Sequence, residues 1–208
     1  MNGRKVLWIG HNMEVFLKYV EHLVKIVPKS IQKVEFKNNG LVLYLDSADL
    51  VNFLYFLKYH TNLQYKILVD LTCVDYVESL ARFEITYSLL SIKYNSRLRL
   101  KVYCSDSISI SSIQNCFSNA VWLEREVWDL FGVFFKGNRD LRRILTDYGF
   151  DGFPLRKDFP LSGYVEVRYD ELKKSIVYES LELTQAYRNF HFLSPWEFNK
   201  NTKVLKVK

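Results

Sequence analysis

Two stretches in the first 60 residues have the apolar spacing of amphipathic helices. Residues 13–27 repeat apolar side chains on one helical face, and Pro28 follows as a stop. Residues 48–60 are rich in Leu, Phe and Tyr, and Asp46 or Ser47 is the predicted N-cap. The sequence therefore predicts a helix at each of these places.

Other segments carry the β-branched, aromatic and alternating residues of strands. The first two flank Asn38-Asn39-Gly40, where an Asn-Gly step suits the positive φ angles of a tight hairpin. The predicted strands are residues 31–37, 41–45, 65–77, 83–94 and 97–104. The last of them alternates basic with apolar residues, which predicts one basic, solvent-facing side.

A third helix is predicted from about Ser111 to Phe131, with an apolar stripe near a 3.6-residue period. Its predicted wet face comprises Trp122, Arg125, Glu126 and Asp129, and Arg125 and Asp129 are spaced to pair on the surface. Elements in the order α-β-β-α-β-β-β-α do not alternate strictly. The pattern therefore favours an α+β domain over residues 1–135 with a mixed or antiparallel sheet.

Residues 136–208 are predicted to form an extended, largely irregular C-terminal arm. The stretch 123–170 holds five of the eight glycines and two of the four prolines. Phe153 and Phe159 each precede a proline, which favours extended backbone. Backbone groups outside regular elements need partners in water or on another surface. We therefore expect the arm to dock on partner proteins.

The distribution of charge along the chain bears on whether the protein binds nucleic acid. The 208 residues carry a formal net charge of +6, yet residues 121–170 carry 8 basic against 9 acidic side chains. A nucleic-acid footprint is usually a concentrated basic stripe. A nucleic-acid-binding module stays the alternative if Arg97, Arg99 and Lys101 share a face with Lys200, Lys203 and Lys206.

The sequence contains no pattern typical of a zinc or iron–sulfur site. Cys73, Cys104 and Cys116 form no CxxC pair, whereas zinc or iron–sulfur sites need about four clustered ligands. None of the four histidines, His11, His22, His60 and His191, has a helical or cysteine partner. No run approaches the ~20 apolar residues of a spanning helix. The N-terminus lacks the features of a signal or transit peptide, so we expect synthesis in the compartment where the protein works.

Two polar groups permit a chemical interpretation beside a structural one. Glu124, Glu126 and Asp129 would be an acid–base cluster if catalytic, or an ordinary helix face with one interfacial acid, which is favoured because no nucleophile or histidine lies nearby. Arg142 and Arg143, in a short helix predicted over Asp140–Asp147, would clamp an anion or enter ion pairs. Ion pairs are favoured, since no glycine-rich loop leads into a helix there.

Three motifs in the central stretch resemble one family. They are EREVWDLFGV from Glu124, DLRRIL from Asp140 and GFPLRKDFP from Gly152. Together they are similar to the NADH dehydrogenase subunit 9 family, whose members are a hydrophilic part of respiratory complex I. The preceding order of elements also resembles that family's amino-terminal domain.

This resemblance implies a non-catalytic structural subunit of the peripheral arm of NADH:ubiquinone oxidoreductase, the enzyme that couples NADH oxidation and ubiquinone reduction to proton translocation. It implies no cofactor on this chain, with FMN and iron–sulfur clusters on neighbouring subunits. The implied partners are the large hydrophilic quinone-site subunit and the iron–sulfur subunits. The implied location is the matrix side of the mitochondrial inner membrane; a bacterial relative on the cytoplasmic side, or a chloroplast-type one, is the alternative.

The resemblance also implies that the motif residues are architectural and lie at or under a partner interface. The expected interface residues are Glu124, Arg125, Glu126, Trp128, Asp129, Phe131, Gly132, Asp140, Arg142, Arg143, Pro154, Leu155, Arg156, Lys157, Asp158 and Pro160.

Overall fold

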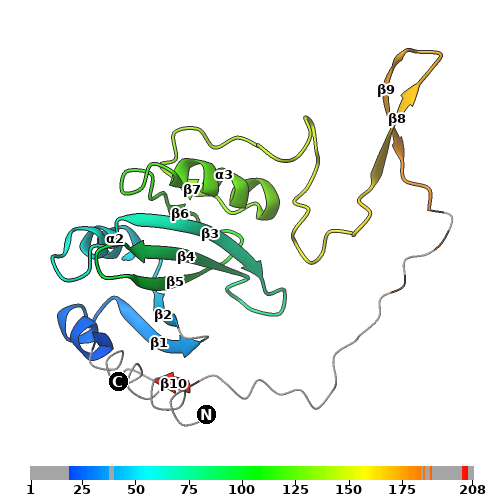
Figure 1. Cartoon of the computed structure of the whole chain (residues 1–208). Helices are drawn as coiled ribbons and strands as arrows, with labels where there is room; N and C mark the ends of the chain where they lie inside the picture. Colours follow the sequence, from blue (N-terminus) through cyan, green and yellow to red (C-terminus); the bar gives the residue numbers. More distant parts are fainter. Residues whose placement is uncertain (1–18, 38–39, 184, 186–187, 189–202, 206–208) are drawn as a thin grey trace, which may run out of the picture.

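The computed structural model describes residues 19–37, 40–183, 185, 188 and 203–205 (Figure 1). A helix covers residues 19–26, and further elements follow in chain order. They are β1 (Ile31–Lys37), β2 (Gly40–Leu45), α2 (Leu50–Tyr59), β3 (Ile67–Asp75), β4 (Phe83–Ser91), β5 (Ser96–Cys104), β6 (Ile110–Ser111), α3 (Ala120–Phe131), β7 (Phe135–Lys136), β8 (Val165–Asp170), β9 (Ser175–Ser180) and β10 (Lys203–Leu205).

Six strands form one mixed sheet in the order β10-β1-β2-β5-β4-β3. Only the β2–β5 pair in this sheet is parallel, and the other pairs are antiparallel. The α+β fold class is therefore confirmed, including the mixed sheet and the order of its principal helices and strands.

One face of this sheet carries the core. Alternate residues of β2, β4 and β5 are fully buried there with the apolar side of α2, which contributes Leu50, Phe53, Leu54 and Leu57. The opposite face of β5 carries Arg97, Arg99, Lys101 and Tyr103, which are exposed or half-buried. The predicted basic side of this strand is thus confirmed.

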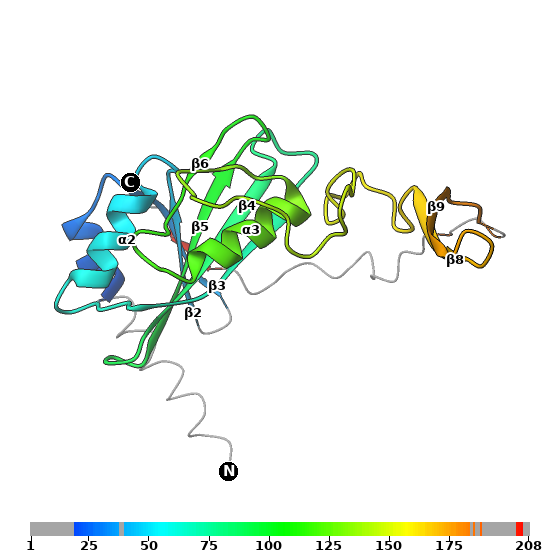
Figure 2. The same cartoon turned by 90° about the horizontal axis from the view of Figure 1, so that it is seen from above.

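Helix α3 lies beside the edge strand β3, as Figures 1 and 2 both show. The Asn119 side chain donates a hydrogen bond of 2.8 Å to the Leu68 carbonyl of that edge. The helix begins at Ala120 rather than at Ser111, because residues 110–111 pair with β7 as a short strand instead. The C-terminal end of α3, at Phe131, lies just before the start of the arm.

Three local predictions differ from the structure. The N-cap of α2 is Asp49, without a side-chain cap hydrogen bond, so the predicted Asp46 or Ser47 cap is wrong. No helix covers 140–147, and the arm includes a β-hairpin that was not predicted. The Asn38–Asn39 turn, His11 and His191 lie outside the described residues.

Candidate partner-docking site

The carboxylate of Asp129 organises the start of the arm. It accepts hydrogen bonds from the backbone N–H groups of Ile144, Leu145 and Thr146 at 3.2, 2.8 and 3.0 Å, and from the Thr146 hydroxyl at 2.6 Å. Arg143 Nη1 lies 2.8 Å from Asp129 Oδ1. These amide groups point at the carboxylate instead of at carbonyls one helical turn back, which explains why no helix forms over 140–147.

Asp129 itself is fully buried. Burial opposes its ionisation, but the hydrogen bonds from Thr146, Leu145 and Arg143 outweigh burial and hold the pKa of the carboxyl well below its usual range. The predicted solvated face of α3 is therefore wrong at this position. It is wrong at Arg125 too, which is buried and donates to the carbonyls of Arg142 and Arg143 rather than pairing with Asp129.

Arg143 connects this helix to the aromatic part of the arm. Its Nη2 donates to the Gly152 carbonyl at 2.9 Å. Its guanidinium lies over the rings of Trp128, Phe150 and Phe153, with 5.3–5.9 Å to their centroids. The charge of Arg143 is therefore balanced by Asp129, and its guanidinium is packed against aromatic rings. These contacts favour an ion-pairing role for this arginine over the binding of an external anion.

A second arginine fastens the arm to the C-terminal end of α3. Arg156 Nε donates to the Phe131 carbonyl at 2.6 Å, and its Nη2 lies 2.7 Å from Asp106 Oδ1. The Leu155 N–H donates to the Leu130 carbonyl at 3.1 Å. Helix-end carbonyls, which have no partner within the helix, are thus capped by the arm.

A third attachment lies at the end of β3. Asp75 is buried and receives a bidentate contact from Arg82, with distances of 2.7 and 2.8 Å. The Lys157 N–H donates to Asp75 at 2.9 Å, and Arg82 also pairs with Asp158 at 3.1 Å. The hydrogen bonds from Arg82 lower the pKa of Asp75. We call residues 139–160, held by these three attachments, the strap.

Glu124 forms a separate buried anchor on α3. Its carboxylate accepts from Ser112 Oγ at 2.6 Å, from the Ile113 N–H at 2.7 Å and from Asn138 Nδ2 at 2.8 Å. Burial raises the pKa of this carboxyl. All three donors belong to the loops around β6 and β7, so the residue ties the chain on either side of α3 together. This geometry is that of a structural acid.

The sixteen residues expected at an interface therefore differ in accessibility. The buried ones are Glu124, Arg125, Asp129 and Phe131. The half-buried ones are Glu126, Trp128, Gly132, Arg143, Pro154, Arg156 and Pro160. The exposed ones are Asp140, Arg142, Leu155, Lys157 and Asp158. The structure thus brings most of them together on α3 and the strap, many in contacts within the chain, and their role at a partner interface stays a prediction.

The hairpin of β8 and β9 was missed from sequence. Its register pairs Val167 with Tyr178 and Tyr169 with Ile176, which gathers these side chains on one face together with Val165. Each of the five is 53–63% exposed. Strict alternation in Val165-Glu166-Val167-Arg168-Tyr169-Asp170 was the signal for this strand. We call these five residues the apolar face of the hairpin.

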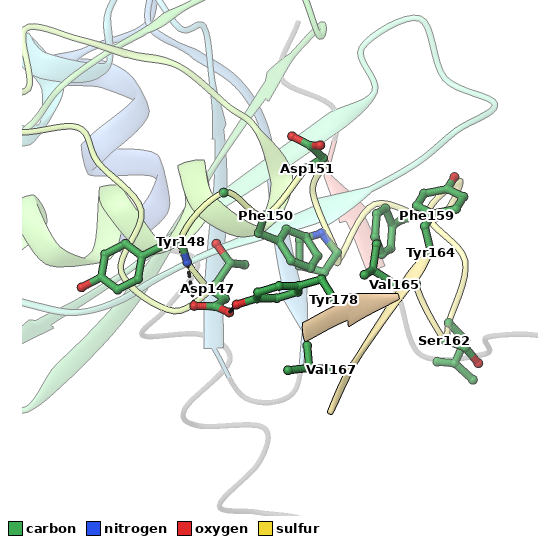
Figure 3. Close-up of a pocket in the computed structure, with 15 residues that line it drawn as sticks. Asp147, Tyr148, Phe150, Asp151, Phe159, Ser162, Tyr164, Val165, Val167 and Tyr178 are labelled. Atoms are coloured by element: carbon green, nitrogen blue, oxygen red, sulfur yellow. Dashed lines mark hydrogen bonds between the residues drawn. The ribbon is translucent and has the colours of Figure 1, made fainter. Parts of the chain in front are cut away.

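The hairpin projects away from the six-stranded sheet (Figure 1) and contacts the strap at its base. The Tyr178 hydroxyl donates to Asp147 Oδ2 at 2.6 Å, as the dashed line in Figure 3 marks. Between hairpin and strap lies a hollow of about 790 Å³. Aromatic and aliphatic side chains line much of it, including Phe150, Phe159, Tyr164, Val165 and Val167 (Figure 3).

The hairpin surface is exposed and apolar. A two-stranded hairpin in water is marginally stable on its own, and its apolar face is uncovered among the described residues. No group of three or more His, Cys, Asp or Glu side chains within the described ranges is arranged to hold a metal ion. The same part of the chain contains no helix long and apolar enough to cross a bilayer.

Comparison with known proteins gives concordant results. Residues 43–165 match the family model described as respiratory-chain NADH dehydrogenase, 30 kDa subunit. The chain is 53% identical to NADH-ubiquinone oxidoreductase subunit 9 of Reclinomonas americana over 175 residues, covering 84% of this chain and 86% of that protein. It is 50% identical to the mitochondrial NADH-ubiquinone oxidoreductase 30.4 kDa subunit of Neurospora crassa, covering 86% of this chain and 64% of that one.

Among solved structures, a chain of an archaeal respiratory membrane complex, the membrane-bound sulfane sulfur reductase, has a similar fold. The TM-score is 0.59 at 22% identity, and the match covers 77% of this chain and 98% of that one.

Proposed function

Because the chain belongs to the family of the 30 kDa subunit of respiratory-chain NADH dehydrogenase, we propose that it acts as a non-catalytic structural subunit of that oxidoreductase. The chain is a subunit of NADH:ubiquinone oxidoreductase, and its relatives include mitochondrial ones. Our proposal concerns its role there: the six-stranded sheet, to which β10 of the arm also belongs, is the folded body, and the strap and hairpin of the arm grip neighbouring subunits.

The observation that carries this proposal is the apolar face of the hairpin. Val165, Val167, Tyr169, Ile176 and Tyr178 expose more than half of their surface side by side. Contiguous apolar surface of this kind is typical of protein–protein interfaces, and aromatic residues are enriched there. The strap supports the same role, since its Arg143 pairs with buried Asp129 of α3 and its Asp147 accepts a hydrogen bond from Tyr178 of the hairpin.

The chemistry of the acids also supports a structural role. The oxygens of Asp129 and Glu124 are occupied by donors from the same chain. A general acid or base must reach the proton it transfers, and these carboxylates lie under the surface. The acid–base alternative therefore receives no support from their geometry.

We further propose that FMN and the iron–sulfur clusters reside on neighbouring subunits. Cys73, Cys104 and Cys116 are free and buried. Burial raises the pKa of each thiol, that of Cys104 to about 11. Iron–sulfur clusters are held by thiolates, which this environment disfavours.

The proposed partners are the large hydrophilic subunit that helps to form the quinone site and the iron–sulfur subunits beside it. The proposed location is the peripheral arm on the matrix side of the mitochondrial inner membrane.

The nucleic-acid alternative rests on Arg97, Arg99 and Lys101 sharing a face with the tail lysines. Lys200 and Lys206 lie outside the described residues, so that test stays open.

The test is to measure NADH oxidation and ubiquinone reduction by the purified full-length chain and by membranes that contain the assembled oxidoreductase. We expect no turnover from the chain alone, and we expect the chain to co-purify with the membrane activity. Turnover by the isolated chain, or its absence from the active assembly, would contradict the proposal.

A further inference from the structure

The six-stranded sheet has a polar face on the side opposite the core. Strand β5 lies between β2 and β4 in the middle of the sheet. Its outward residues Arg97, Arg99, Lys101 and Tyr103 follow one another at every second position.

One half of this face is internally neutralised. Lys101 Nζ lies 2.5 Å from Glu84 Oε1, and the Tyr103 hydroxyl donates to Glu84 Oε2 at 2.7 Å. The Tyr44 hydroxyl donates to Glu35 at 2.8 Å, and Lys33 pairs with the same carboxylate. The rings of Tyr44 and Tyr103 stack with 5.8 Å between centroids. Each cation here has its own acid.

The other half is not neutralised. The side chains of Arg97 and Arg99 have no ion-pair or hydrogen-bond partner in the described part of the chain. They line a hollow of about 310 Å³ together with Gly40, Asp70 and Ser88. A Cβ on Gly40 would lie 3.5 Å from Arg99 Nη2, so the guanidinium lies beside the space that a side chain at this position would occupy. Two arginines with available donors therefore surround one depression.

Asp70 is the only acid that lines this hollow among the described residues. Its Oδ1 accepts a hydrogen bond of 2.8 Å from the Leu71 N–H, and it forms no salt bridge with either arginine. The cross-strand register places Asp70 opposite Ser88 and Ser88 opposite Arg99, so Asp70 is two strands away from that arginine. Within the described residues, neither guanidinium is therefore neutralised by a carboxylate.

We propose that this hollow binds an acidic segment of a neighbouring protein subunit, through carboxylates that pair with Arg97 and Arg99. The guanidinium fork matches a carboxylate with two parallel hydrogen bonds. Residues two apart on a strand are separated by roughly 7 Å. Acidic side chains at alternate positions of an extended segment, or one helical turn apart, have a similar spacing.

The carboxylates on the same face would repel some classes of anionic partner more than others. Asp70, Glu84 and Glu35 lie on the strands around the two arginines. A phosphate backbone or an anionic bilayer presents negative charge everywhere and would meet these carboxylates as well as the arginines. A protein segment presents charge at chosen positions and can avoid them. The mixed charge therefore favours a protein partner.

The experiment uses the purified full-length chain and a fluorescent ten-residue peptide of alternating Glu and Thr, with binding followed by anisotropy at two salt concentrations. The variant Arg97→Gln/Arg99→Gln removes both guanidinium groups. The control Lys25→Gln/Lys29→Gln removes the same net charge from two exposed positions at and just after the end of the first helix. Thermal unfolding of each variant verifies that the fold is intact.

We expect salt-sensitive peptide binding that is at least tenfold weaker in Arg97→Gln/Arg99→Gln and within twofold of the original in the control. Replacement of both arginines by lysine should give an intermediate affinity, because the charge stays and the fork is lost. A DNA duplex and phosphatidylserine vesicles serve as competing probes. Failure of the unmodified chain to bind the peptide, equal loss in the control, or stronger binding of duplex or vesicles through these arginines would overturn the proposal. The identity of the partner as a neighbouring subunit rests on the proposed function, but the peptide assay involves neither the hairpin nor the assembled oxidoreductase, so either proposal can fail while the other stands.

Discussion

Asp129 in the last turn of α3 and Arg143 in the strap form an ion pair with 2.8 Å between Oδ1 and Nη1, and the carboxylate side is fully buried. The two residues are 14 positions apart in sequence. Their contact fixes where the chain turns after the folded body, and the three amide groups that bind the same carboxylate fix its backbone. This pair is one of the three attachments that hold the strap.

Replacement of Asp129 by Asn should destabilise the chain strongly. The substitution leaves Arg143 without its charge partner and places an amide group among donors. Breaking a buried ion pair from one side costs on the order of 3 kcal/mol. Urea unfolding of the full-length chain measures this loss.

The matched control is Asp140→Asn, because Asp140 pairs with Arg142 where both side chains are at least half exposed. Exposed pairs contribute roughly 0–1 kcal/mol, so this variant should unfold almost like the original. Similar midpoints for the two variants would show that the Asp129 pair does not hold the strap.

The stability difference between the original chain and Asp129→Asn should depend on pH in one direction. The folded-state pKa of Asp129 is lowered, so its contribution is present in full above the unfolded value of about 3.9. It is lost as pH falls through the folded pKa. Unfolding free energies measured from pH 7 to pH 3 should therefore differ by a constant amount down to about pH 4 and converge below it. A difference that widens on acidification would contradict the assignment.

Gly132 tests the packing of the strap against α3. It caps the helix with a φ of +78°, and an added Cβ would lie 2.6 Å from atoms of Phe153 and Arg156. Gly137 has a φ of +89° with nothing within 4 Å of such a Cβ. Both substitutions by Ala carry the left-handed backbone cost of roughly 1–2 kcal/mol.

Only Gly132→Ala should also displace the strap, which adds a cost of about 1–3 kcal/mol from overpacking. Limited proteolysis within residues 139–160 should then become faster in Gly132→Ala and stay unchanged in Gly137→Ala. Equal unfolding free energies and equal cleavage rates would indicate that the strap does not pack on Gly132.

Periodicity predicted the body of the fold because the sheet has one clear core face. The strands and helices predicted over 31–104 match β1 to β5 and α2 to within a few residues at their ends. The alternating patterns of β3 and β5 and the 3.6-residue pattern of α2 reflect burial mainly on one side, whereas β2 is buried throughout Leu41–Leu45. The same reasoning failed for α3, where Arg125 and Asp129 lie on the polar stripe yet are buried.

The reason for that failure is the strap. A later segment covers the polar side of α3 and supplies carbonyls to Arg125 and donors to Asp129. Sequence spacing within the helix contains no information about a segment that returns 14 residues later. The hairpin was within reach, since the alternation from Val165 to Asp170 was visible in the sequence. It was not predicted because all of residues 136–208 were assigned to a largely irregular arm.

The most direct test of the docking role compares the two faces of the hairpin. Val167→Ser/Tyr169→Ser removes part of the apolar face, and Glu166→Ser/Arg168→Ser alters the opposite face of the same strand, where Arg168 pairs with Glu179 near the surface. Native electrophoresis of membranes, with detection of this chain, measures its incorporation into the oxidoreductase. We predict that Val167→Ser/Tyr169→Ser loses most of its incorporation while Glu166→Ser/Arg168→Ser keeps it. Full incorporation of the Val167→Ser/Tyr169→Ser chain would contradict the account.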